Sequence, residues 1–153
     1  RKMLMKINEK APYYALEATS PQTMRIYKNH QHFEYMILES INELIDNGYC
    51  MLNHLYVNKG QEGAFEQKFL QCQQHLASVP GFRALRFLRP NEQGQHYVII
   101  TQWLNHQSFK NWQQSSAYSQ THQKRGTSQG ADVRLVNRKL SYHIGIICER
   151  YTS

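Results

Sequence analysis

The chain has 153 residues and a mass of 18.1 kDa, which fits one domain or one and a half. Its 18 Lys and Arg against 11 Asp and Glu give a formal charge of +7, and a hydrophobic fraction of 41% excludes global disorder. No apolar run reaches the roughly 18 residues that a membrane-spanning helix needs.

The first residues of the chain and its cysteines indicate the cellular compartment in which the protein is expected. Residues 1–6 contain no apolar segment of signal-peptide length, and because residue 1 is Arg rather than Met we expect further residues upstream. The three cysteines, Cys50, Cys72 and Cys148, are odd in number and far apart, which argues against a disulfide framework and against a zinc site of paired cysteines. We therefore expect a cytoplasmic protein.

The excess of positive charge is scattered along the chain. Arg83, Arg86 and Arg89 fall in one expected strand, where alternation sends Arg86 to the opposite face from the other two. Lys124 and Arg125 form the only close basic pair after a helical segment. Because no clustered basic footprint or basic-aromatic motif is present, we do not expect a nucleic-acid partner.

The N-terminal part of the chain is predicted to be rich in strands. Residues 15–18, 24–28 and 33–38 favour strands, and residues 29–31 between the last two favour a hairpin turn. The turn signal at 46–48, Asp-Asn-Gly, separates this part from the rest of the chain.

The chain from residue 49 onward predicts a ferredoxin-like unit. Its expected elements are a strand (49–57), a helix (62–77), two strands joined by a hairpin turn (82–89 and 96–103), a helix from about His106, a short helix after a break at Ser115–Ser116 that ends near Lys124, a loop (126–130) and a closing strand (140–151). The order β-α-β-β-α-β is that of the ferredoxin-like unit, so the predicted class is α+β.

Such a unit covers one sheet face with its helices and leaves the other face open. Residues 1–48 are too short to enclose a core of their own, so we expect their strands to cover that face and complete a β-barrel, with residues 49–153 as the second domain. This arrangement predicts a monomer. A docked extension on a protein that still dimerises is the alternative.

Three side chains stand out as candidates for chemistry. Asn53 interrupts the apolar odd-numbered face of the first strand of the unit, Trp112 lies with Phe109 on the inner face of the second helix, and His122 is on the short helix that follows. Alternative interpretations are an amide bonded to neighbouring backbone, a core-filling tryptophan and a surface histidine. Because the first strand and the second helix of the unit face each other, Asn53 can lie opposite Trp112 and His122, as in a heme site with a proximal His and a distal donor.

Residues 49–151 resemble the antibiotic biosynthesis monooxygenase (ABM) fold family, and within it the heme-degrading monooxygenases of the IsdG and HmoB type. The N-terminal extension is typical of the long HmoB form. The resemblance is carried by Pro80-Gly81-Phe82, Leu88-Arg89-Pro90, Tyr97-Val98-Ile99 and the segment from Asn111 to Ser128, and the Asn, Trp, His trio of that type is matched by Asn53, Trp112 and His122.

The resemblance implies a bacterial heme oxygenase for which heme is both substrate and cofactor. His122 would ligate the heme iron, Asn53 would donate a hydrogen bond to the oxygen that the iron binds, and the ring of Trp112 would buckle the porphyrin. Phe69 would cover the apolar heme face. Lys68 would meet a propionate, with Lys124 and Arg125 as further candidates.

The same resemblance implies an external electron source. No flavin or nicotinamide motif is present, so electrons would come from a separate reductase, with O2 as the second substrate and iron and an open-chain tetrapyrrole as products. The alternatives are a non-enzymatic heme carrier or sensor, a cofactor-independent monooxygenase acting on a polycyclic phenol, and a signalling or scaffold protein on the same fold.

Overall fold

The computed structural model describes residues 3–6, 14–115 and 132–150. The strands are β1 (Met3–Lys6), β2 (Tyr14–Ser20), β3 (Thr23–Lys28), β4 (Gln31–Ile41), β5 (Tyr49–Val57), β6 (Phe82–Pro90), β7 (Tyr97–Trp103) and β8 (Val136–Arg150). The helices are α1 (Glu62–Phe69), the 3-10 helix η1 (Gln74–Ser78), α2 (His106–Gln113) and α4 (Asp132–Leu135). No helix among these elements is long and apolar enough to cross a membrane.

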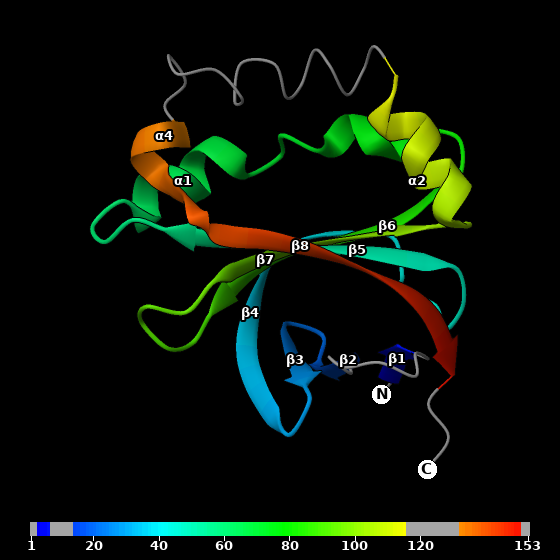
Figure 1. Cartoon of the computed structure of the whole chain (residues 1–153), viewed down its shortest axis with the longest axis horizontal. Helices are drawn as coiled ribbons and strands as arrows, with labels where there is room; N and C mark the ends of the chain where they lie inside the picture. Colours follow the sequence, from blue (N-terminus) through cyan, green and yellow to red (C-terminus); the bar gives the residue numbers. More distant parts are fainter. Residues whose placement is uncertain (1–2, 7–13, 116–131, 151–153) are drawn as a thin grey trace.

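The eight strands form a closed antiparallel barrel in the order β1-β2-β3-β4-β6-β7-β5-β8. The stretch β6-β7-β5-β8 is the sheet of the ferredoxin-like unit, and the N-terminal strands join its two edges because β4 pairs with β6 and β1 pairs with β8. Figure 1 shows the helices on one side of this sheet and β1 to β4 on the other. The predicted α+β fold with a barrel completed by N-terminal strands is confirmed.

Alternation along the strands of the unit divides the core into two layers. On β5, Cys50 and Leu52 are fully buried inside the barrel, whereas Met51 and Val57 pack against the helices. The barrel layer also contains Leu16, Met24 and Ile26 of the N-terminal strands, so these strands bury apolar side chains against the unit as the sequence predicted. The face of the sheet that looks toward the helices carries the candidate site.

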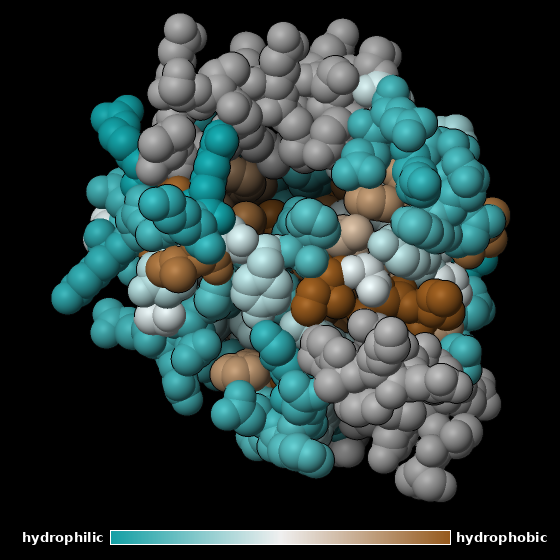
Figure 2. Space-filling view, viewed as in Figure 1, coloured by the Kyte–Doolittle hydropathy of each residue, from teal (hydrophilic) through white to brown (hydrophobic). Residues whose placement is uncertain are grey.

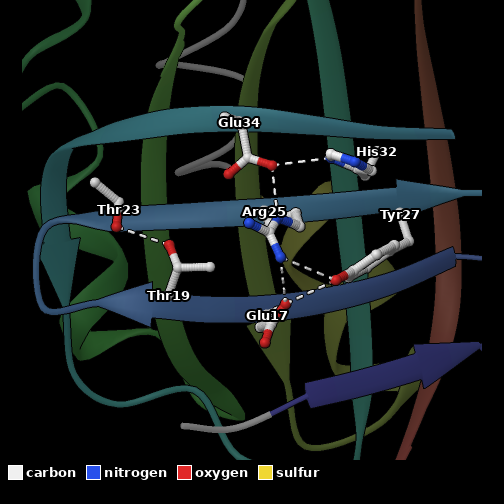
Figure 3. A network of polar contacts seen from close by, with 7 residues as sticks. All are labelled: Glu17, Thr19, Thr23, Arg25, Tyr27, His32 and Glu34. Carbon is white, nitrogen blue, oxygen red and sulfur yellow. Dashed lines mark hydrogen bonds and ion pairs between the residues drawn. The ribbon is translucent and has the colours of Figure 1, made fainter.

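The N-terminal strands are held in register by a polar network on their outer face (Figure 3). Arg25 on β3 donates to Glu34 on β4, at 2.5 Å, and pairs with Glu17 on β2, at 3.4 Å. Tyr27 donates to the same Glu17 carboxylate. Because Glu17 and Glu34 are the direct cross-strand partners of Arg25, these contacts stabilise one pairing of the three strands.

The predicted turn at 46–48 leads directly into β5. Gly48 has a φ of +85°, and a Cβ at this position would lie 2.3 Å from the backbone oxygen of Trp103. Only glycine meets both conditions. The turn therefore fixes where β5 begins beside β7, and the predicted strand 49–57 has the observed bounds.

The helix predicted over 62–77 is wrong in its length. α1 ends at Phe69, Gln71 adopts a positive φ of 65°, and a separate 3-10 helix follows from Gln74. A non-glycine residue with positive φ cannot continue a helix. β4 extends over Gln31–Ile41 rather than 33–38 and so includes residue 31 of the expected turn, β8 begins at Val136 rather than at 140, and β1 and α4 were not predicted. The short helix expected after Ser116 and the loop expected at 126–130 lie outside the described residues.

Candidate functional site

A cavity of about 320 Å³ lies between the sheet and the helices. β5, β7 and β8 supply its sheet side, and α1, the segment after it and α2 supply its helix side. In Figure 2 the surface is hollowed above β8, and brown, hydrophobic side chains lie in the hollow. The volume falls within the range of small-molecule sites, about 300–1,000 Å³.

The sheet side of the cavity presents one amide among apolar groups. Met51, Asn53 and Leu55 are successive residues of β5 on the face that looks toward the helices, and all three line the cavity. The Asn53 side chain is exposed, and it makes no hydrogen bond within the described part of the chain. Among the described residues, the Asn53 amide is therefore not bonded to adjacent backbone, which was the alternative interpretation.

The helix side is built by α2, whose start is fixed by a cap. The side chain of Asn105 accepts a hydrogen bond from the backbone N–H of Ser108, at 2.8 Å. Phe109 and Trp112 follow at i, i+3 on the buried face of the helix, with 7% and 5% of their surface exposed. Trp112 stacks on Trp103 of β7, with ring centroids 5.3 Å apart, so the indole is held rigidly while one side of it lines the cavity.

The end of α1 and the segment after it complete the helix side. Phe69, which the family resemblance implies as cover for a heme face, is 5% exposed and lines the cavity. Gln73 also lines it, is 7% exposed and has an Oε1 atom without a hydrogen-bond partner among the described residues. Lys68 is exposed on α1 and is not one of the residues that line the cavity.

A carboxylate fastens α1 to the sheet beside the cavity. Glu66 accepts two hydrogen bonds from Arg89 of β6, at 2.8 and 2.7 Å, and one from the hydroxyl of Tyr97 of β7. The guanidinium of Arg89 and the Tyr97 hydroxyl hold the pKa of Glu66 below its ordinary value, against the opposing effect of burial. Phe65, on the same helix, is fully buried against Tyr97.

Three polar residues of β8 that the sequence reasoning missed, Arg138, Ser141 and His143, also line the cavity. His143 is the direct cross-strand partner of Asn53, so the imidazole and the amide project from the same face of the sheet. Arg138 lies nearer the start of β8 and is exposed. The antiparallel pairing of the first and last strands, expected for the ferredoxin-like unit, points to a partner for Asn53, but the register that selects His143 is not readable from the sequence.

The remaining predicted site residues lie outside the described residues. His122, Lys124 and Arg125 all fall in 116–131. The structure therefore brings together Asn53, Trp112 and Phe69 from the predicted set, and adds Gln73, Arg138 and His143.

Comparison with known proteins identifies the family. The family model described as antibiotic biosynthesis monooxygenase matches residues 48–124, which is half of the chain and contains β5, α1, β6, β7 and α2.

Solved structures with the same fold have different stated activities. A major regulator of staphylococcal pathogenesis matches with a TM-score of 0.71 and 11% identity, over 99% of this chain and 85% of that chain. LmHde, a heme-degrading enzyme from Listeria monocytogenes, matches with a TM-score of 0.61 and 14% identity, over 94% and 82%. SnoaB, a cofactor-independent oxygenase from Streptomyces nogalater, matches with a TM-score of 0.52 and 23% identity, over 69% and 96%. At these identities the likeness shows the fold alone.

Proposed function

Because this chain belongs to the antibiotic biosynthesis monooxygenase family, we propose that the cavity on the helix face of the sheet is an oxygenase site and that its substrate is heme. The activity proposed is a heme-degrading monooxygenase of the long, HmoB type. The observation that carries the proposal is that the free amide of Asn53 and the rigid ring of Trp112 line one cavity, from the sheet and from the helix.

The residues that line the cavity fit a flat, largely apolar ligand with an anionic edge. Phe69, Phe109 and Trp112 supply aromatic surface, and the sheet adds Met51 and Ile99. Gln73 adds a buried amide whose Oε1 atom lacks a hydrogen-bond partner among the described residues. This atom accepts hydrogen bonds, and heme with ionised propionates has no donor for it, so a bound water would have to supply one.

Cationic side chains suit the propionates of heme. Arg138 lies on the border of the cavity and can bind a carboxylate in bidentate fashion. We include Arg125 and Lys68 as further propionate partners on the strength of the resemblance alone. Arg138→Gln should weaken heme binding, with Lys139→Gln, the adjacent exposed cation of β8, as the matched control.

When bound, heme supplies the iron at which O2 is activated and the macrocycle that is oxidised. The residues of the chain would orient the bound ligand and exclude water from the cavity. The side-chain N–H of Asn53 would donate a hydrogen bond to the ligand from the sheet, and Trp112, which stacks on Trp103, would contact the ligand from the helix side.

We propose that His122 is the iron ligand. The register between β5 and β8 identifies His143 as the histidine against which this assignment can be tested. His143 also lines the cavity, but it projects from the same face as Asn53 because the two residues are direct partners. His143 would therefore act as a second polar group next to Asn53, whereas His122, which comes from another segment of the chain, would hold the iron.

Hemin titration of the purified protein tests this assignment. The expected result is a saturable Soret band with one site, lost or strongly shifted in His122→Ala and retained in His143→Ala. The reverse pattern, with ligation lost in His143→Ala alone, would reject His122 as the ligand and Asn53 as the opposing donor. No heme binding at micromolar protein would reject heme as the substrate.

Electrons are proposed to come from a separate reductase, and O2 is the second substrate. We also propose that the protein acts in the cytoplasm. Cys50, Cys72 and Cys148 are not joined in a disulfide, although the Sγ atoms of Cys50 and Cys148 lie 2.9 Å apart inside the barrel. A chemical reductant replaces the reductase in the experiments below.

The second candidate is a cofactor-independent oxygenase acting on a polycyclic phenol. It is favoured by the modest volume of the cavity, about 320 Å³, and by an exposed amide that can orient a phenol without any iron ligand. The titration separates the two, since this candidate predicts no Soret complex. A non-enzymatic heme carrier or sensor predicts a stable complex that is not degraded.

A further inference from the structure

A second cavity, of about 490 Å³, lies at one end of the barrel on the opposite face of β5 and β8. His54 of β5 and Tyr142 of β8 line it, and each is the chain neighbour of a residue that lines the first cavity, Asn53 and His143. Alternation along the strands thus places two cavities back to back, separated by the thickness of one sheet.

The second cavity has an exposed entrance and a buried floor. His30 and Gln31, at the turn between β3 and β4, are exposed at its rim. The floor is formed by Tyr14, Tyr35 and His54, which are 1%, 4% and 4% exposed. A ligand entering past the turn would therefore meet aromatic rings inside the barrel.

The charge within this cavity is positive. Lys28 extends its ammonium group over the ring of Tyr142, 4.9 Å from the centroid, and donates to the Tyr142 hydroxyl at 3.0 Å. Among the described residues that line the cavity there is no Asp or Glu. A half-buried ammonium without an acidic neighbour in the cavity favours an anionic ligand.

A buried imidazole on the floor lacks one hydrogen-bond partner. His54 stacks on Tyr142, with ring centroids 4.3 Å apart and planes 9° from parallel, and its Nδ1 atom is buried without a partner among the described residues. Burial lowers the pKa of His54 to about 4, with smaller contributions from Lys28 and His96. The ring is neutral at pH 7, and the orphan nitrogen can bind a polar substituent.

We propose that this cavity is a second ligand site, which binds a small planar aromatic acid. The carboxylate lies at Lys28, the ring packs against the aromatic side chains of the cavity, and a polar substituent of the ligand satisfies Nδ1 of His54. This inference does not depend on heme, because none of its residues lines the first cavity.

Calorimetric titration with 2-naphthoate as the probe tests the site, with 2-naphthamide as the uncharged analogue. The expected result is one saturable site whose Kd rises about tenfold or more for 2-naphthamide and for Lys28→Met, because a charge-assisted contact is lost. His54→Phe keeps a ring at this position and removes the nitrogens. It should weaken the binding of hydroxyl-substituted naphthoates more than the binding of 2-naphthoate itself. Asn53→Ala and Arg138→Met, on the opposite face, should leave the Kd unchanged.

Amide chemical shifts of the labelled full chain provide a second readout that does not depend on the folding of any variant. They should move on addition of 2-naphthoate at the β3–β4 turn and around residues 95–96. The proposal is overturned if the probe does not saturate at millimolar concentration. It is also overturned if binding survives Lys28→Met unchanged, or if binding is lost in Arg138→Met and the shifts map to α2, which would assign the probe to the first cavity.

Discussion

Asn53 is the residue on which the proposed chemistry depends most directly. It is an exposed amide on an otherwise apolar row of β5, with no hydrogen bond to the described residues around it. An amide in this position contributes nothing evident to packing. The proposed function assigns it a role, that of a donor to a bound ligand.

We expect Asn53→Ala to keep hemin affinity close to that of the unmodified protein and to lower the degradation rate by about 100-fold or more, as removal of one positioned donor does in other enzymes. Binding is dominated by apolar contact and iron ligation, which this change leaves in place. The decay of the Soret band under a reductant measures the rate. Asn91→Ala, in the β6–β7 turn, is the matched control, and full turnover in Asn53→Ala would remove this amide from the mechanism.

A second prediction concerns the buried imidazole of His54. Its pKa is lowered to about 4 in the folded protein, from about 6.5 in an unfolded chain, so the unfolded state binds the proton more tightly. The contribution of His54 to the free energy of unfolding should therefore be fully present above pH 6.5. It should be lost as the pH falls through 4, which lowers the free energy of unfolding by up to about 3 kcal/mol. Urea unfolding at several pH values measures it.

His54→Phe is the comparison that isolates this effect, since it keeps a ring on Tyr142. The pH dependence between 6.5 and 4 should be shallower in His54→Phe than in the unmodified protein. Equal slopes in the two proteins would show that His54 is not buried as a neutral ring. The control variant is His30→Phe, because His30 is exposed. His75 is less suitable, since its Nε2 atom is also buried without a partner among the described residues.

Among the elements, α1 is held to the sheet by the polar contacts of Glu66. It has only eight residues, and Glu66 fastens it to β6 through Arg89 and to β7 through Tyr97. Phe69 at its end lines the cavity, so the position of this wall follows from these contacts.

We expect Glu66→Gln to lower the free energy of unfolding at pH 7 by about 1 kcal/mol, a value reduced because Arg89 is 46% exposed. The pKa of Glu66 is lowered on folding, so its contribution is present at neutral pH and is lost as the pH falls through that lowered pKa. The free energies of unfolding of Glu66→Gln and of the unmodified protein should therefore become equal in acid. Glu92→Gln, in an exposed turn, should match the unmodified protein throughout, and a difference that widens in acid would contradict this account.

The elements that the sequence predicted well are those with a strong local signal. β5 alternates regularly and follows a turn that only glycine can complete, so its bounds were predicted correctly. α1 was predicted too long because its apolar spacing continues past Phe69, while Gln71 adopts a positive φ and its backbone N–H binds the carboxylate of Glu39 on β4. β1 is four residues long, too short for a pattern, and acquires its place by pairing with β8.

The candidate site was predicted in part for the same reason. Asn53 and Trp112 could be found because each interrupts or marks a periodic apolar face, whereas Phe69 was named as a site residue through the family resemblance. His143, Arg138 and Gln73 could not, since their positions depend on the register between β5 and β8 and on the break after α1. Strand register over such a distance in sequence is a tertiary property.

At the scale of the whole molecule, the barrel closes within one chain. β4 and β1 occupy the two edges of the ferredoxin-like sheet, which would otherwise be open to pairing with a second copy. The face opposite the helices is covered by β2 and β3 side chains packed in the barrel core.

We therefore expect a monomer in solution. Sedimentation equilibrium should give a mass near 18.1 kDa, the mass of one chain. A mass near twice this value, unchanged on dilution, would show that the chain dimerises through another surface.

We propose above all that heme is oxidised in the cavity between the sheet and the helices. The most direct measurement is to add ascorbate in air to the hemin-loaded protein, with catalase present, and to follow both the Soret band and the iron captured by a ferrous chelator. Loss of the band together with release of iron in proportion to the heme consumed is the predicted result. A Soret band that persists under these conditions, or one that disappears only when catalase is left out, would contradict it.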